Sequence, residues 1–317
     1  MSRHPYSELT LDAFWRNRRD PGYEVGTGAI PEWLTSDQRV ATAGSCFAQH
    51  VGRAMKARGF SLLDYERPPE FLARDLWEEF GYNLYSARYG NIYSVRQLRE
   101  LIDEATGDVP LSHIVWEGSG GRYFDALRPS VTPCGLSAPE LVIESRRHHL
   151  NAVSLLLQEM QVFVFTLGLT EYWYDIEGGR CLPTAPGVVA GLWSQDKFSF
   201  HNAMYPEVAG DLRNIVRKLK SIRADVKILL TVSPVPLAAT ASGSHVVDAT
   251  QYSKSVLRAV AGDIAREFPG VAYYPSYEII TNLQGSEYYY EADGRTVSGE
   301  GVRLVMNRLF ASDSGFP

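Results

Sequence analysis

The feature that most constrains the fold is a regular alternation of short apolar runs with longer amphipathic segments. Runs of β-branched and aromatic residues are typical of buried strands, and apolar residues at i, i+4 spacing are typical of helices. The predicted strands are 39–43, 161–167, 227–232 and 271–275, and the predicted helices are 46–58, 148–159, 206–222, 252–268 and 299–310. This alternation predicts an α/β fold, with a mostly parallel sheet between helices on both faces.

Two segments stand outside this alternation. Residues 62–145, rich in Trp, Tyr and Pro, are interpreted as a large insertion after the first strand–helix unit. Residues 1–37 are punctuated by Trp, Pro and Gly and are interpreted as an N-terminal extension packed on the core. Residues 38–317 are then expected to form a single domain, because about 300 residues are within the reach of one α/β domain.

Composition excludes several classes of protein. The net charge of -6 comes from scattered residues without a Lys/Arg run, so a nucleic-acid partner is not expected. The apolar stretches are far shorter than the roughly 20 residues that span a bilayer, so no membrane span is expected. The N-terminus has no apolar signal-peptide core, and cytoplasmic localisation is predicted.

Neither a metal nor a cofactor is expected from the motifs present. The three cysteines (Cys46, Cys134 and Cys181) lack CxxC spacing, which argues against a zinc site and a disulfide framework. The sequence contains no HExxH motif, no dinucleotide-binding glycine motif and no P-loop.

The strongest local signal is Gly44-Ser45, between the first predicted strand and its helix. Reactive groups of such sheets gather at the carboxyl ends of the strands. The backbone N–H of Ser45 is expected to point into a cleft, where unpaired N–H groups at a helix start stabilise an oxyanion. Two alternatives remain open: Ser45 is only the N-cap of the helix, or the neighbouring Cys46 is the nucleophile.

Several dispersed segments resemble one known family. The run Ala43-Gly44-Ser45-Cys46-Phe47-Ala48 is similar to the signature of the GSCFA-domain family, a branch of the SGNH (GDSL-like) hydrolase superfamily. The resemblance extends over roughly 41–310 and includes 90–93, 166–173, 183–187, 200–202, 231–235 and 252–255. It implies a three-layer sandwich of the SGNH or flavodoxin-like type.

The resemblance also implies roles for the first two sequence blocks. Ser45 stands at the position of the superfamily's nucleophile. Gly90 matches the second block, whose glycine N–H helps to form the oxyanion hole, and Asn91 follows it in the same substrate-binding turn.

The third block departs partly from the family pattern. Many relatives have Gly-x-Asn-Asp, in which the Asn side chain donates a hydrogen bond to the oxyanion. Here the block begins at Gly168, and Thr170 and Glu171 take the Asn and Asp positions. A hydroxyl still donates a hydrogen bond, with a shorter reach than an amide.

The fourth block departs further. Relatives carry Asp-x-x-His, in which the His is the base and the Asp orients it, but this chain has Asp293 and Thr296. A Thr hydroxyl is not a base near neutral pH. His245, in the polar loop after the third predicted strand, is the first choice for a relocated base, and His201 is the second.

The resulting prediction is a serine esterase or O-acyl (acetyl) transferase that acts on a small or saccharide-linked ester through an acylated Ser45. An activated acyl donor such as an acyl-CoA is compatible with the transferase. The alternative is a degenerate SGNH fold that binds a carbohydrate or a partner, which the Thr at position 296 favours.

Overall fold

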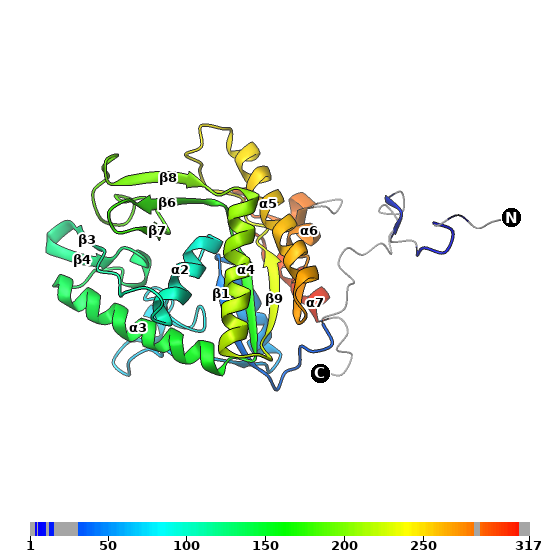
Figure 1. Cartoon of the computed structure of the whole chain (residues 1–317), viewed down its shortest axis with the longest axis horizontal. Coiled ribbons are helices and arrows are strands. Elements are labelled where there is room, and N and C mark those ends of the chain that lie inside the picture. Colours follow the sequence, from blue (N-terminus) through cyan, green and yellow to red (C-terminus); the bar gives the residue numbers. More distant parts are fainter. Residues whose placement is uncertain (1–3, 5, 11–12, 16–30, 282–285, 311–317) are drawn as a thin grey trace.

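Five parallel strands form the central sheet of the computed structural model, which describes residues 4, 6–10, 13–15, 31–281 and 286–310 (Figure 1). Their order is β10-β9-β5-β1-β2. The strands are β1 (Arg39–Gly44), β2 (Ser61–Leu62), β5 (Val162–Leu167), β9 (Lys227–Val232) and β10 (Val271–Tyr274). Counted from the β2 edge, this is the flavodoxin-like order 2-1-3-4-5. The predicted α/β fold with a parallel sheet is confirmed.

Helices cover both faces of this sheet. One layer consists of α1 (Phe47–Ala57), α6 (Ser276–Thr281) and α7 (Gly299–Leu309). The other consists of α2 (Val95–Ala105), α3 (Pro139–Glu159), α4 (Tyr205–Ile222) and α5 (Val246–Glu267). The predicted three layers therefore follow from two separate apolar cores, one on each side of the sheet.

The side chains of β5 show how one strand serves both cores. Phe163 and Phe165 pack with the helices α2 to α5, whereas Val162 and Val164 pack with α1, α6 and α7. Successive residues of a strand point to opposite faces, so a strand buried on both sides is apolar throughout. This is why 161–167 is nearly continuous in apolar residues.

The segment 62–145, interpreted from the sequence as an insertion, supplies part of the hydrophobic core. It contains α2, whose N-cap Ser94 accepts a hydrogen bond from the Gln97 N–H, and α2 packs against α3 and α4. It also contains a hairpin of β3 (Val115–Gly118) and β4 (Arg122–Asp125). The short edge strand β2 begins just before it and was not predicted, because two residues give no periodicity. The domain boundaries themselves remain a prediction.

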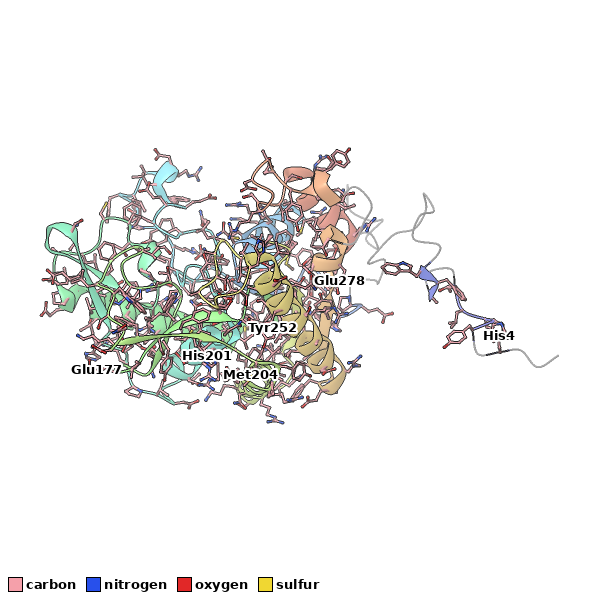
Figure 2. All side chains as sticks on the ribbon, turned by 90° about the horizontal axis from the view of Figure 1, so that it is seen from above. His4, Glu177, His201, Met204, Tyr252 and Glu278 are labelled. Atoms are coloured by element: carbon pink, nitrogen blue, oxygen red, sulfur yellow. The ribbon has the colours of Figure 1, made fainter. Side chains whose placement is uncertain are left out.

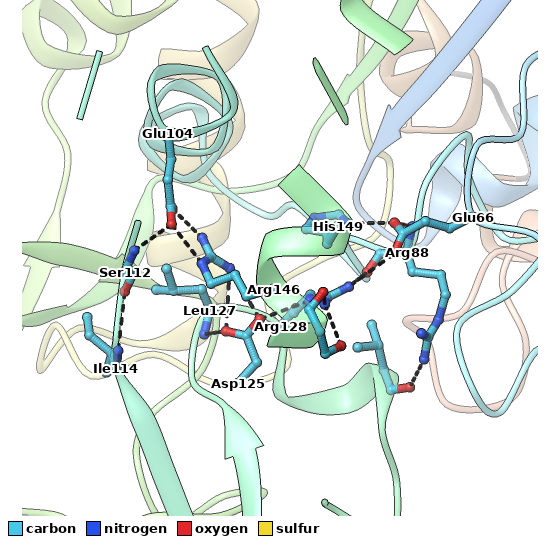
Figure 3. Close-up of polar contacts among 12 residues, drawn as sticks. Glu66, Arg88, Glu104, Ser112, Ile114, Asp125, Leu127, Arg128, Arg146 and His149 are labelled. Carbon is cyan, nitrogen blue, oxygen red and sulfur yellow. Dashed lines mark hydrogen bonds and ion pairs between the residues drawn. The ribbon is translucent and has the colours of Figure 1, made fainter. Parts of the chain in front are cut away.

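Buried ion pairs fasten this segment to α3 (Figure 3). Arg146 of α3 donates to Glu104 of α2, 2.9 Å from Nε to Oε1, and its Nη1 lies 3.2 Å from Oδ2 of Asp125. His149, also on α3, lies 2.6 Å from Glu66. Because all these charged groups are paired, burying them is tolerated.

A second, antiparallel sheet follows β5 directly. It consists of β6 (Glu171–Asp175), β7 (Arg180–Leu182) and β8 (Phe198–Asn202) in the order β7-β6-β8. In Figure 1 it extends beyond the carboxyl ends of the central strands, above α2. The sheet therefore places residues 171 and 202 beside the end of β5.

Part of the N-terminal segment 1–37 is described. Leu34 is buried and Trp33 packs against the core formed with α1 and α7. The packing of most residues before position 31 lies outside the described residues. Within the described ranges, no helix has the length and apolarity needed to cross a membrane.

Candidate active site

The topology singles out one edge of the sheet. The chain leaves β1 toward β2 on one side, and the next strand, β5, lies on the other side of β1. Such a switch point opens a crevice beyond the carboxyl ends of the two central strands, where α/β proteins bind ligands. Ser45 follows β1 and Gly168 follows β5, so both lie at the edge of the sheet where such a crevice is expected, and this edge is called the crevice below.

Gly44 allows β1 to approach β5 closely at this point. Its φ is +142°, and a Cβ on Gly44 would lie 2.4 Å from the carbonyl oxygen of Thr166. The Ser45 N–H then donates to that oxygen over 3.2 Å. The expectation that this N–H points freely into the cleft was therefore wrong, because the parallel ladder continues one residue beyond Gly44.

The Ser45 side chain, by contrast, is buried and makes no hydrogen bond with the described residues. The residue is 4% exposed, and its Oγ has no hydrogen-bond partner among the described residues. The N-cap of α1 is Cys46, which makes no side-chain cap, so the N-cap interpretation of Ser45 was also wrong. Leaving a buried hydroxyl unpaired costs free energy, which is typical of a group that meets a ligand.

Gly168 forms the wall beside Ser45. A Cβ on Gly168 would lie 3.1 Å from the Ser45 Cβ and 2.7 Å from the Tyr93 carbonyl oxygen. The next residue, Leu169, donates its N–H to that same carbonyl over 2.9 Å. Only glycine leaves room for the three segments to meet here, and this brings 45, 93 and 168 into contact.

The Gly90-Asn91 turn is close to the same place. The Tyr85 hydroxyl lies 3.1 Å from the Ser45 carbonyl oxygen and also contacts Asn91 Oδ1. Asn91 Nδ2 in turn donates to the Tyr93 hydroxyl over 3.0 Å. Gly90 has φ +68°, and within the described ranges its N–H has no partner.

The third block is completed in space by a residue from β8. The Thr170 hydroxyl donates to Oδ1 of Asn202 over 2.6 Å, and the Thr170 N–H donates to the Ser253 hydroxyl over 2.9 Å. Because the oxygen of Asn202 is occupied, its NH₂ group is left to donate elsewhere. An amide donor thus stands beside Thr170 although the local sequence has none. Glu171 accepts a hydrogen bond from the Thr240 hydroxyl over 2.6 Å.

The two candidate histidines are engaged elsewhere. His245 is exposed at the N-cap of α5, where its Nδ1 accepts the Val247 N–H over 3.2 Å. His201 Nε2 lies 2.8 Å from Glu207, and Figure 2 places His201 near Met204 at the start of α4. Neither is hydrogen-bonded to Ser45, so the expected contact of His245 with the Ser45 hydroxyl is not found.

Asp293 and Thr296 form a turn that is closed on itself. The Thr296 hydroxyl and N–H both donate to Asp293, over 2.6 and 2.8 Å, and both residues are exposed. The Thr296 side chain and the backbone N–H groups lower the pKa of Asp293 to about 2. The residue between them, Arg295, donates to the Pro236 carbonyl over 3.1 Å and acts electrostatically on the crevice residue Tyr93.

One residue of the crevice was missed by the sequence analysis. Lys254 of α5 is 1% exposed, and its Nζ donates to the Gly168 carbonyl over 2.6 Å. Burial lowers the pKa of Lys254 to about 7, while Cys46 raises it and Arg295 lowers it further. A signal was available, because Lys254 lies on the buried stripe of α5 with Leu257 and Ala261, where an apolar residue is expected.

A cavity adjoins the crevice. It has a volume of about 260 Å³, and its lining includes Asn91 and Tyr93 together with Pro183 and the exposed loop residues Val188 and Val189. The lining combines apolar side chains with polar ones such as Asn91, Arg128 and Thr184, so it offers both apolar and hydrogen-bonding contacts to a small molecule. Within the described residues, no group of three or more His, Cys, Asp or Glu is placed to hold a metal ion.

Comparison with known proteins bears on this geometry. The GSCFA family profile matches residues 39–309, which covers the sheet, both helix layers and the crevice. The chain belongs to the GSCFA family. Among curated proteins no match was found.

One solved structure with some likeness to this GSCFA protein is a candidate platelet activating factor from Streptococcus pneumonia. The identity is 13% and the TM-score 0.30, over 55% of this chain and 66% of that one, just under two thirds of its length. A likeness this slight does not bear on the activity.

Proposed function

We propose that this GSCFA-family protein is a serine esterase or O-acyltransferase, with Ser45 as the nucleophile, as the resemblance to SGNH hydrolases implies. The observation that carries the proposal is the buried, unpartnered Ser45 hydroxyl at the carboxyl end of β1. A hydroxyl that is left unpaired by its own protein is available to attack an ester carbonyl.

Donors for the developing oxyanion are at hand. The Asn202 NH₂ group, oriented by the Thr170 hydroxyl, and the Gly90 N–H are the two groups we assign to this role. Donors held in place by the fold need no reorganisation when charge develops on the carbonyl oxygen. Transfer of the acyl group from Ser45 to water makes the protein an esterase, and transfer to an alcohol makes it a transferase.

The adjoining cavity supports an acyl or alcohol group of modest size. About 260 Å³ lies just below the usual range for drug-sized ligands, which fits an acetyl or other short acyl group with part of its alcohol. Val188 and Val189 are exposed at its rim. A saccharide-linked ester could then extend from the cavity over this apolar loop.

A second candidate function is a binding module with a vestigial site. It is favoured by the exposed position of Thr296 and by the engagement of His245 as a helix cap, since neither supplies a base to Ser45. In that case the crevice binds an acylated ligand without turning it over.

Labelling with a fluorophosphonate and measurement of intact mass separates these functions. We expect the wild-type protein to gain one phosphonyl group, Cys46→Ala to gain one as well, and Ser45→Ala to gain none. The matched cysteine variant is the control, because Cys46 is adjacent in the same turn. Labelling that survives in Ser45→Ala and disappears in Cys46→Ala would make the thiol the nucleophile, and an unlabelled wild-type protein would favour the binding module.

A further inference from the structure

The buried amine of Lys254 has no role in what has been described so far. It is 1% exposed, on α5, among side chains of the apolar core. Among the described residues it has no carboxylate partner, and its only hydrogen bond is with the Gly168 carbonyl. An ammonium ion buried with a single neutral acceptor is poorly stabilised, so the position favours the neutral amine.

Gly168 connects this amine to the nucleophile. Its carbonyl oxygen is 2.6 Å from Lys254 Nζ, and its Cα hydrogen faces the Ser45 Cβ, which lies 3.1 Å from where a Cβ would be. Lys254 and Ser45 therefore both contact Gly168, Lys254 at its carbonyl oxygen and Ser45 at its Cα. Cys46, in the strand–helix turn, also acts electrostatically on the Lys254 amine.

The Ser45 hydroxyl lacks a partner, and the expected histidines do not supply one. A neutral amine has a lone pair as well as two N–H groups. One N–H is used by the Gly168 carbonyl, which leaves the lone pair to accept a proton. Catalytic hydrogen bonds are often open before substrate binds and close in the complex.

We infer that Lys254 is the general base of this site and takes the proton of Ser45, directly after rotation of the serine side chain or through one water molecule. The inference rests on the proposed function. A residue of α5 thus supplies the base that the block 293–296 lacks, since Thr296 stands at the position of the family's His.

The proton balance is complete within the site. As Ser45 Oγ bonds to the ester carbonyl carbon, its proton moves to Lys254 Nζ, and the oxyanion is held by the assigned donors. When the carbon–oxygen bond to the alcohol breaks, the Lys254 ammonium returns that proton to the leaving oxygen. Water, or an acceptor alcohol, then attacks the acyl-serine and gives its proton to Lys254, which passes it to the departing Ser45 Oγ.

Two groups tune the base from other elements. Burial lowers the pKa of Lys254 to about 7, Cys46 at the start of α1 raises it, and Arg295 in the loop before α7 lowers it. A base whose pKa lies near the working pH combines availability with basicity. The wild-type rate should therefore rise with pH up to about 7 and then level off.

The test is the rate of fluorophosphonate labelling of Ser45 in Lys254→Met and Lys254→Arg, over pH 5–9. Loss of a general base costs about a hundredfold or more, so we expect that loss in both variants, and no inflection near pH 7 in either. Methionine matches the length of the buried chain without an amine. Arginine keeps the hydrogen-bond donors but stays protonated, so activity retained in Lys254→Arg would show that the residue only donates to Gly168.

Lys56→Met is the matched control, because Lys56 is an exposed lysine on α1, and its labelling should equal that of the wild type. Ethylamine added to Lys254→Ala should restore labelling in proportion to the free amine, which a structural role would not allow. Wild-type labelling without a pH inflection overturns the inference even if a variant misfolds. Equal labelling of wild type and Lys254→Met also overturns it while leaving Ser45 as nucleophile, and an unlabelled wild type overturns both proposals.

Discussion

At the scale of single residues, two glycines allow the crevice to form. Gly44 lets β1 close onto Thr166, and Gly168 lets Ser45, Tyr93 and the Lys254 amine share one small volume. Neither site has room for a methyl group. The functional side chains come together here because Gly44 and Gly168, which lie between them, have no side chain.

Replacing Gly44 by alanine should destabilise the protein by on the order of 3 kcal/mol or more, because an alanine is strained at φ +142° and its Cβ would lie 2.4 Å from a backbone oxygen. Urea denaturation followed by circular dichroism measures the change. Gly59→Ala is the control: its φ is also positive, at +80°, but a Cβ there meets nothing within 4 Å, so only the strain of about 1 kcal/mol is expected. Similar losses in both variants would mean that the close contact at Gly44 is unimportant.

At the scale of elements, α3 holds the segment 62–145 against the core through charged residues. Arg146 is 4% exposed and joins Glu104 of α2 to Asp125 of β4 (Figure 3). Burial alone would raise the pKa of Asp125, but Arg146 and Arg128 hold it below its usual value. The segment contains both α2 and the Gly90-Asn91 turn, so this network also fixes one wall of the crevice.

Arg146→Met should therefore cost about 3–5 kcal/mol of stability, because it leaves Glu104 buried without its ion-pair partner and Asp125 with Arg128 alone. The measurement is again urea denaturation at neutral pH. The adjacent Arg147 is exposed and pairs with the exposed Glu144, so Arg147→Met should cost less than about 1 kcal/mol. A loss below 1 kcal/mol for Arg146→Met would show that the network is dispensable.

At the scale of the whole molecule, burying the Lys254 amine at the crevice lowers the free energy of unfolding while the amine is protonated. The pKa of Lys254 is about 7 in the folded protein, against 10.5 in an unfolded chain. Between these values the unfolded chain binds a proton that the folded protein has released, so stability rises with pH across this window. Below pH 7 both states are protonated, and the penalty is present in full.

Lys254→Met removes this penalty and should stabilise the protein by on the order of a few kcal/mol at pH 6, with the gain shrinking as the pH approaches 10. Denaturation of both proteins at several pH values measures the difference. Lys56→Met should show no such trend, because that side chain is exposed. A gain that stays constant from pH 6 to 10 would argue that the folded pKa of Lys254 is not lowered.

The sequence by itself determined the elements and the position of Ser45. Strand and helix periodicities are local, and so is the rule that Gly44-Ser45 follows a strand and opens a helix. They predicted β1, β5, β9 and β10 within about a residue at each end, whereas α3 begins nine residues and α5 six residues earlier than expected. The family resemblance added Gly90, Asn91, Gly168 and Thr170, which the structure brings to the same edge.

Only the tertiary structure decided which polar groups share the crevice with Ser45. Asn202 reaches Thr170 through the pairing of β6 with β8, and Lys254 reaches Gly168 because α5 packs on the sheet with that face inward. His245, at the start of the same helix, stays exposed. The contacts of Asn202 with Thr170 and of Lys254 with Gly168 join residues 32 and 86 positions apart. They depend on strand pairing and on which face of α5 is buried, and no local sequence pattern specifies either.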